Sequence, residues 1–274
     1  LIPPSVPLIL YAVQTETSIG QLLIAGVLPG VLLAILLCVY IVFSSVKLGS
    51  KLEKAPWKER FVSLKTIWPM VLLVLIVLVV IYLGIGTSTE AAAFGALGAL
   101  VIGLAMKRLN FKSVMEAFKD ATQQTAMIFT IVIGGYIFAY FFTLTGVGQD
   151  IISTIAESGL SKWTILFFII IFYLILGLFM DLIGSMILTL PLIFPIIQSL
   201  GFDEIWFGVI VVLLLEIGLV TPPVGINLFI TSKYTDIPVG KVFKGSIPFI
   251  GILLLTILIL IIFPEIVLYL PTNM

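Results

Sequence analysis

Long runs of apolar residues without a single charge recur along the whole of this sequence. Residues 66–89, for example, contain no acidic or basic side chain, and 163–180 and 245–264 are equally uncharged. About 20 apolar residues suffice for a helix to cross a lipid bilayer. Only 10% of the 274 residues are charged, whereas a soluble domain carries about 25%. The sequence therefore predicts an all-α membrane protein.

About eight hydrophobic segments are expected, separated by loops that hold most of the charges. The polar stretch 107–123 has apolar residues at helical spacing, so we expect it to lie along the membrane surface. Residues 1–12 resemble the end of an earlier segment, and the sequence begins with Leu1, so we expect it to be part of a longer chain. The expected segments are 18–43, 67–86, 88–106, 124–146, 163–180, 186–200, 205–232 and 246–264.

The positions of the basic residues predict the orientation. The loops 44–66, 107–123 and 233–244 hold 13 of the 14 basic residues, and only Lys162 lies elsewhere. The positive-inside rule places these loops in the cytoplasm and the stretches around 147–162 and 201–204 outside.

The two segments 163–180 and 186–200 must then enter and leave on the outer side. The second is short and contains Pro191 and Pro195, which makes it a poor membrane span. We therefore expect a re-entrant helical hairpin over 163–200 with its tip at 181–185. Non-helical backbone at membrane depth is tolerated only where it is buried in protein or lines a cavity, so the tip is a candidate site.

An internal repeat supports this topology. Pro3 and Pro4 match Pro222 and Pro223 at an offset of 219 residues, and the same offset relates Gly26 to Gly245 and Pro29 to Pro248. The predicted topology gives the two Pro-Pro breaks opposite directions through the membrane, which is typical of an inverted repeat with a binding site near the midplane. We divide the chain into 1–66, the end of the first repeat, and 67–274, the second repeat with the hairpin 163–200 and the broken helix 205–232.

The Pro-Pro breaks suggest what such a site could bind. Adjacent prolines remove backbone donors and free carbonyl groups, which can coordinate a cation. The helix that starts after the break presents free N–H groups to an anion. The alternative is a pair of proline kinks without a ligand. The symmetry of the breaks and their polar neighbours favour a binding site.

Several motifs resemble the large membrane subunit of tripartite ATP-independent periplasmic (TRAP) transporters, in about its C-terminal two-thirds. They are IPPSVPLILY (2–11), SIGQLLIAGVLPG (18–30), GTSTEAAAFG (86–95) and the block from Asp181 through EIGLVTPPVGINLF (216–229). The resemblance implies a sodium-driven, inverted-repeat elevator-type secondary transporter, multi-pass in the bacterial inner membrane. It also implies a small membrane subunit and a periplasmic substrate-binding protein that delivers an organic acid. Leu215 departs from the polar residue that the family often has there.

The candidate site combines the two breaks with the hairpin tip. Thr221, Gly225 and Asn227 offer the oxygen atoms that a hard cation prefers, and Asn227 could instead bond a neighbouring helix. We expect sodium to bind through Ser185 and Thr221, with Gly184 allowing close approach and Ser5 taking the matching place at the first break. The candidate sodium- and substrate-binding residues are Pro3, Pro4, Ser5, Asp181, Gly184, Ser185, Thr221, Pro222, Pro223, Gly225 and Asn227.

Three acids lie inside the predicted segments, and acids at membrane depth are candidates for function. Each could instead bond nearby backbone. Asp181 at the hairpin tip favours a functional role, and Glu216 favours a supporting one behind the site. Glu90 follows Thr87 and Thr89, which could cap a helix start, so both interpretations stay open for this group.

A sodium-coupled importer of a C4-dicarboxylate, sialic acid or a similar carboxylate is thus the first functional hypothesis. The alternatives are a sodium-coupled anion transporter of the same architecture without a binding protein, or a structural membrane subunit. An enzyme is disfavoured because the sequence has no His and no nucleophile–base arrangement. No cofactor is expected, and sodium is the expected coupling ion. With zero net charge the chain shows no affinity for nucleic acid, and its one cysteine, Cys38, suggests no disulfide.

Overall fold

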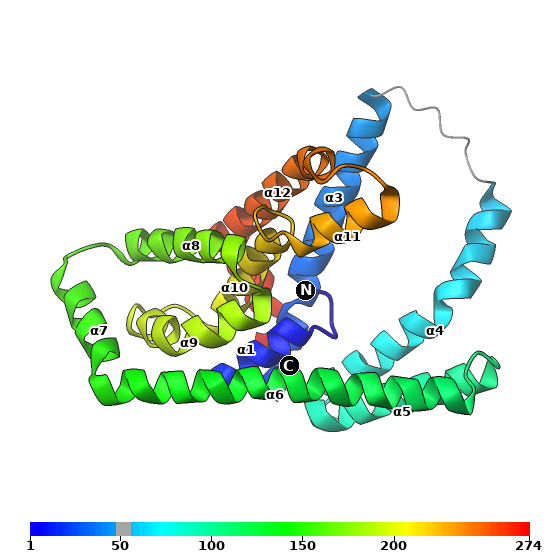
Figure 1. The fold of residues 1–274 in the computed structure, drawn as a ribbon, viewed down its shortest axis with the longest axis horizontal. Helices are drawn as coiled ribbons and strands as arrows, with labels where there is room; N and C mark the ends of the chain where they lie inside the picture. Colours follow the sequence, from blue (N-terminus) through cyan, green and yellow to red (C-terminus); the bar gives the residue numbers. More distant parts are fainter. Residues whose placement is uncertain (48–55) are drawn as a thin grey trace. The chain divides into compact units, whose positions relative to one another are not determined.

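The computed structural model describes residues 1–47 and 56–274, and these residues form helices without any strand (Figure 1). The chain divides into two compact units. Unit 1 contains residues 1–34 and 128–273, and unit 2 contains residues 35–127 with Met274. The boundaries between the units fall within the helices α3 (Val27–Lys47) and α6 (Phe111–Thr145).

Six described helices are long and apolar enough to cross a membrane, and a seventh span results if the two parts of α4, which meet at 51°, count as one. Eight segments were expected. The difference arises mainly at 205–232, which the structure splits into α10 and α11, of 16 and 10 residues. The other helices are α1 (Val6–Thr15), α2 (Ile19–Ala25), α4 (Trp57–Tyr82), α5 (Ser88–Ala105), α7 (Val147–Glu157), α8 (Lys162–Phe179), α9 (Leu182–Ser199), α10 (Glu204–Leu219), α11 (Ile226–Thr235), α12 (Val239–Ile262) and α13 (Glu265–Thr272).

Helix α10 forms the core of unit 1. It is apolar on all sides, as expected of a helix that is covered all round, and it packs against α1, α2, α8, α9, α12 and α13. Two hydrogen bonds, one from a buried hydroxyl and one from a buried indole, fix the first turn of α10. The Tyr11 hydroxyl donates to the carbonyl of Glu204 at 2.8 Å, and the Trp206 indole donates to the carbonyl of Leu260 at 2.8 Å. The helix that leads to the second Pro-Pro break is therefore fixed at its start.

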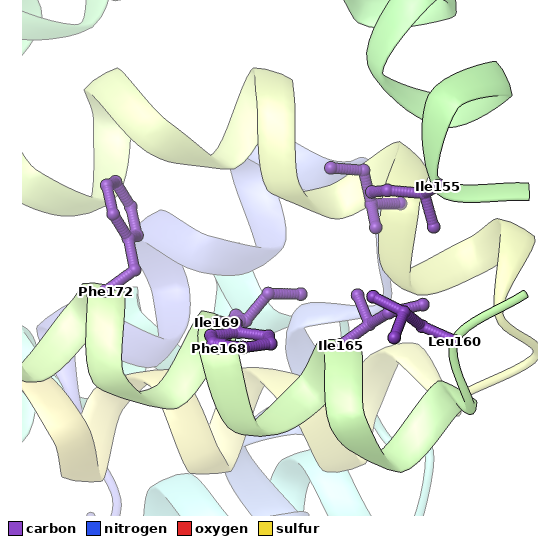
Figure 2. Close-up of a pocket in the computed structure, with 7 residues that line it drawn as sticks. Ile155, Leu160, Ile165, Phe168, Ile169 and Phe172 are labelled. Atoms are coloured by element: carbon purple, nitrogen blue, oxygen red, sulfur yellow. The ribbon is translucent and has the colours of Figure 1, made fainter. Parts of the chain in front are cut away.

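An apolar cavity of about 280 Å³ lies in unit 1 between α7, α8 and α9 (Figure 2). Its lining consists entirely of hydrocarbon side chains, so it offers no hydrogen bond to a polar ligand. It lies away from the predicted hairpin tip, because its lining on α8 ends at Phe172 and its lining on α9 is a residue of the second half of that helix. The lining residues are Ile155, Leu160, Ile165, Phe168, Ile169, Phe172 and Ile196.

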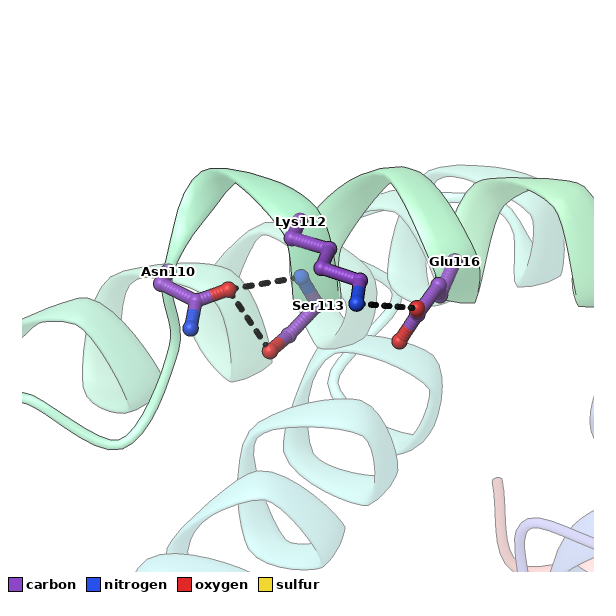
Figure 3. Close-up of polar contacts among 4 residues, drawn as sticks. All are labelled: Asn110, Lys112, Ser113 and Glu116. Carbon is purple, nitrogen blue, oxygen red and sulfur yellow. Dashed lines mark hydrogen bonds and ion pairs between the residues drawn. The ribbon is translucent and has the colours of Figure 1, made fainter.

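Helix α6 differs from the sequence prediction, because the expected surface helix at 107–123 and the segment 124–146 form one helix of 35 residues. Asn110 caps its start: the Asn110 Oδ1 accepts from the Ser113 backbone N–H at 2.8 Å and from the Ser113 hydroxyl at 2.9 Å (Figure 3). The ammonium of Lys112 lies 3.9 Å from a carboxylate oxygen of Glu116. A helix of this length is about 52 Å long, well beyond the roughly 30 Å of membrane hydrocarbon. The polar stretch is therefore an extension of the apolar helix and not a separate element.

In unit 2, α4 and α5 pack side by side through small residues. A Cβ atom on Gly95 would lie 3.0 Å from Val77, and one on Gly98 would lie 2.8 Å from Leu73. Close approach at small residues is how membrane helices associate when burial supplies little driving force. These glycines therefore serve helix packing.

Other boundaries also differ from the prediction. The basic stretch 44–66 is not a loop in its described part, since α3 ends at Lys47 and α4 begins at Trp57; residues 48–55, with Lys51 and Lys54, lie outside the described residues. The expected outer stretch 147–162 contains the helix α7, and a further helix, α13, follows the last expected segment.

The argument that 186–200 is too short to span is wrong. Helix α9 begins at Leu182, has 18 residues and contains both Pro191 and Pro195 in its interior. Prolines are tolerated in membrane helices because neighbouring groups satisfy the freed carbonyls. By length, α9 could cross a membrane.

Candidate functional site

Helices α8 and α9 form a hairpin in unit 1, joined by Met180 and Asp181. The hydroxyls of Tyr173 and Thr189 lie 2.9 Å apart, and the rings of Trp163 and Phe202 meet edge to face at 5.3 Å. Residues near the start of α8 thus contact residues just beyond the end of α9, so the two arms run antiparallel. Both open ends of the hairpin therefore lie together; that they face the outer side of the membrane stays a prediction.

Aromatic rings gather at the open end of the hairpin. Trp206 stacks on Phe202 at 5.5 Å, and the Lys162 ammonium lies 5.1 Å from the centre of the Phe202 ring. Trp206 is buried, but Lys162 and Trp163 are exposed, and exposed tryptophan and lysine side chains are typical of the membrane–water interface. The cluster supports an open end at the interface; that the tip lies within the membrane stays a prediction.

At the closed end, Asp181 caps α9. Its Oδ2 accepts from the backbone N–H groups of Ile183 at 3.1 Å and Gly184 at 3.0 Å. The carboxylate therefore has a structural task, and its residue is otherwise exposed. A Cβ on Gly184 would lie 2.8 Å from Asp181 Oδ1, so the close approach that this glycine permits is that of the capping carboxylate.

Ser185 is the most unusual residue of the tip. Its side chain is completely buried, and its hydroxyl is the one buried side-chain oxygen or nitrogen without a hydrogen-bond partner in the described part of the chain. Leaving such a group unpaired costs about 1–3 kcal/mol. Buried polar groups almost always have a partner, so the Ser185 hydroxyl is a candidate to bind a ligand.

The second Pro-Pro break lies next to this hairpin. The backbone N–H of Val224 donates to the carbonyl of Leu178 at 3.2 Å, two residues before the hairpin turn. Four residues before Pro222, a Cβ on Gly218 would overlap the backbone of Gly177. The structure therefore brings α8, near its C-terminal end, against the break between α10 and α11.

Within the break, Thr221 and Gly225 shape the backbone. The Thr221 hydroxyl donates to the Ile217 carbonyl at 2.7 Å, which leaves its oxygen lone pairs free to accept or coordinate. Gly225 is buried with a φ of 33°, and a Cβ there would lie 3.0 Å from the Thr221 carbonyl oxygen. Pro222 is half-buried, whereas Pro223 and Asn227 are exposed. The Pro222–Pro223 bond is cis, as is Pro3–Pro4.

The first break lies in the same unit. Pro3 and Ser5 are buried and Pro4 is exposed. A Cβ on Gly26 would lie 2.5 Å from the carbonyl oxygen of Leu1, so the break rests against the start of α3. Helix α1, which follows the break, packs on α9 and α10. The first break is thus tied to the second arm of the hairpin through α1.

The predicted residues around Glu90 lie at the start of α5. Thr87, Thr89 and Glu90 belong to unit 2, where the Glu90 carboxylate accepts from the Thr87 N–H at 2.7 Å and the Thr87 hydroxyl accepts from the Glu90 N–H at 3.3 Å. This is a reciprocal capping box, which explains the motif by structure. Glu216 is half-buried on α10, five residues before Thr221.

The tip and break offer hydroxyls, backbone carbonyls and the single carboxylate of Asp181. Among the described residues, no group of three or more His, Cys, Asp or Glu side chains could hold a metal ion. Hard cations prefer oxygen ligands, and apart from the capping carboxylate of Asp181 the oxygen atoms at the tip and break are neutral.

A family model for the DctM component of the tripartite ATP-independent periplasmic transporter matches residues 1–266. The chain belongs to the DctM family. It is 38% identical over 274 residues to the C4-dicarboxylate TRAP transporter large permease protein DctM of Pseudomonas aeruginosa, covering 99% of this chain and 64% of the relative.

Two further DctM-family relatives differ in the substrate that their names give. The sialic acid permease SiaM of Vibrio cholerae is 34% identical over 99% of this chain and 64% of its own length. The ectoine/5-hydroxyectoine permease UehC of Ruegeria pomeroyi is 34% identical over 98% and 64%. The chain spans about 64% of the length of these relatives. DctM-family proteins are multi-pass transporter permeases and not enzymes, which confirms both of these predictions.

Two contacts at the site could not be anticipated from the motifs. The Tyr173–Thr189 hydroxyl pair and the Val224–Leu178 backbone bond join segments that lie 16 and 46 residues apart in the chain. Backbone bonds leave no trace in residue identity. A polar signal does exist for the first contact, since Tyr173 is the only hydroxyl-bearing residue between Thr164 and Ser185.

Proposed function

We propose that this chain is part of a TRAP large permease that imports an organic acid across the bacterial inner membrane by sodium symport. A small membrane subunit and a periplasmic substrate-binding protein would complete the transporter. The observation that carries the proposal is the buried, unpartnered hydroxyl of Ser185, on a hairpin whose first arm is bonded to the second Pro-Pro break.

Sodium suits the chemistry of this place. A sodium ion takes several oxygen ligands and needs no full negative charge beside it when carbonyl dipoles point at it. The Ser185 hydroxyl, the Thr221 hydroxyl and backbone carbonyls around Pro222 and Pro223 are such ligands. Binding would also remove the cost of burying the Ser185 hydroxyl without a partner.

An anionic substrate has a separate place at the start of α11. Gly225 precedes this helix and has no side chain with which to cap it. The first N–H groups of a helix lack intrahelical partners and carry a partial positive charge. The names of the relatives above include C4-dicarboxylate and sialic acid, and both ligands are carboxylates, so a carboxylate is the proposed substrate class.

The elevator mechanism and the repeat boundaries belong to the same proposal. The first break is followed by a ten-residue helix that ends in a left-handed Glu16 with φ 57°, and the second by a ten-residue helix that ends in a left-handed Asp236 with φ 56°. This parallel supports 1–66 as the end of one repeat and 67–274 as the other. In an elevator, the hairpin and the breaks would move together relative to a fixed scaffold.

Sodium binding tests the proposal directly. The full-length protein is purified in detergent, and its thermal midpoint is measured as Na⁺ replaces K⁺ at constant ionic strength, since a ligand that binds the folded state raises the midpoint. We expect Ser185→Ala and Thr221→Val each to raise the half-saturating sodium concentration about tenfold, as the loss of one contact to a charge of about 1.5 kcal/mol implies.

The matched control is Thr256→Val. Thr256 is buried in α12 and its hydroxyl donates to the Ile252 carbonyl at 2.8 Å, the same local pattern as Thr221. This control should keep the sodium dependence of the parent protein. Unchanged sodium affinity in folded Ser185→Ala and Thr221→Val proteins would reject the site.

A further inference from the structure

We propose that Tyr173 is a positioning residue for sodium binding: with Thr189 it fixes Ser185 in register with the second Pro-Pro break. This inference rests on the proposed sodium site. It adds two residues that touch neither the ion nor the substrate and that act through α8.

The hydrogen bonds give Tyr173 a defined partner. The Thr189 oxygen lies 2.7 Å from the Ser185 carbonyl oxygen and 2.9 Å from the Tyr173 hydroxyl. A carbonyl can only accept, and threonine has a single hydroxyl proton. When that proton goes to Ser185, Tyr173 donates the proton of the second bond. The three groups then form a chain from α8 to the residue that carries the unpartnered hydroxyl.

The burial of Tyr173 indicates that the hydrogen bond to Thr189 compensates for burying its hydroxyl. Its side chain is completely buried, and its ring packs against Phe207 on α10 at 6.4 Å. Phenylalanine would fill the same space without burying a hydroxyl, which is costly unless the hydroxyl is bonded. In the described structure its bond is to Thr189, across the two arms of the hairpin.

Helix α8 then links the two halves of the proposed site. Leu178, five residues after Tyr173, accepts from Val224 of the break. Thr189, one turn after Ser185, bonds Tyr173. The break and Ser185 are each held to the same rigid helix, so their separation is fixed through it. Without the hydroxyl of Tyr173, the start of α9 loses its polar link to α8.

A sodium titration of variants tests this link. Full-length Tyr173→Phe, Thr189→Val and Thr189→Ser proteins are titrated with Na⁺ against K⁺ and followed by thermal midpoint, as above. Groups that orient a metal ligand typically change affinity by tenfold or more, so we expect Tyr173→Phe and Thr189→Val to raise the half-saturating sodium concentration about tenfold. Thr189→Ser keeps the hydroxyl and should restore the parent value.

Tyr11→Phe is the control for the loss of a buried tyrosine hydroxyl. Tyr11 is also fully buried in unit 1, and its hydroxyl donates to a backbone carbonyl at 2.8 Å, that of Glu204. A purely structural role for Tyr173 predicts that both variants lower the sodium-free thermal midpoint and neither changes sodium affinity. That result would overturn the inference.

The outcome also separates this inference from the proposed function. Weakened sodium binding in Ser185→Ala with parent-like binding in Tyr173→Phe would leave the site in place and reject the positioning role. Parent-like binding in both would reject the site itself. Weakened sodium binding in both variants, together with parent-like binding in Thr189→Ser, supports the complete assignment.

Discussion

The two Pro-Pro breaks share one local design but differ in how they are packed. Each is followed by a ten-residue helix with a left-handed acidic residue at its end. Helix α1 after the first break buries Leu8, Tyr11 and Ala12, whereas α11 after the second buries only Leu228 among its residues. The sequence pattern therefore determines the break, and the surrounding helices determine how exposed it is.

The difference extends to the glycines that support the breaks. Gly26 touches the first break, whereas a Cβ on Gly245, its counterpart in the repeat, would meet no atom within 4 Å. The second break is instead held from the hairpin side, by the Gly177–Gly218 contact and the Val224–Leu178 bond. The first break is thus seated in the core, and the second depends on the hairpin.

The largest expected effect concerns direction. In a Cys38→Ser background, Glu16→Cys and Asp236→Cys place single thiols at the corresponding ends of α1 and α11. An inverted repeat predicts that an impermeant maleimide labels Glu16→Cys only from outside and Asp236→Cys only from the cytoplasm. Labelling of both from the same side would refute the inverted repeat.

The next effect tests the link between the second break and the hairpin. Gly218→Ala places a methyl group against the backbone of Gly177, which cannot move away as a flexible side chain would. Overpacking of this kind costs about 1–3 kcal/mol, so we expect a lower thermal midpoint and weaker sodium binding. Gly251→Ala in α12, with nothing within 4 Å, is the control and should be neutral or stabilising. Equal behaviour of the two variants would contradict the close contact.

The smallest effect distinguishes the two breaks themselves. Gly26→Ala brings a methyl group within 2.5 Å of the Leu1 carbonyl oxygen and 3.0 Å of a Leu8 methyl carbon. It should lower the thermal midpoint by an amount that corresponds to about 1 kcal/mol. The counterpart Gly245→Ala should not, because it meets no neighbour. A similar loss in both variants would mean that the two breaks are supported alike.

Much of the architecture follows from the sequence, because long apolar runs and prolines act locally. The hairpin turn at Met180 and Asp181, the break after Leu219 and the helices α5 and α8 lie close to where the sequence places them, whereas α12 begins at Val239, within the expected loop 233–244. The errors come from context. Pro191 and Pro195 do not end α9, because neighbouring groups in a membrane protein can satisfy the backbone carbonyls that a proline frees. The polar start of α6 belongs to the same helix as the apolar segment that follows it.

The candidate residues could be selected from the sequence, but the role of each one was harder to predict. Ser185 and Thr221 could be selected because hydroxyls next to a turn or a Pro-Pro pair are unusual in an apolar chain. Asp181 and Glu90 are acids within predicted membrane segments, as a functional acid would be, yet each accepts backbone N–H donation at a helix start. Residue type alone does not separate a capping carboxylate from a binding one.

With the aromatic cluster at the open end of the hairpin placed at the membrane interface, the depth of the tip in the membrane depends on how α8 and α9 are inclined. Each arm has 18 residues and is about 27 Å long, nearly the roughly 30 Å thickness of the hydrocarbon layer. With Trp163, which is exposed at the open end, placed at one interface, an upright hairpin would carry Asp181 close to the opposite interface. A tip at the midplane requires strongly inclined arms. Lipid chain length, which changes bilayer thickness, is therefore expected to act on the inclination of the arms and through it on the depth of the proposed sodium site.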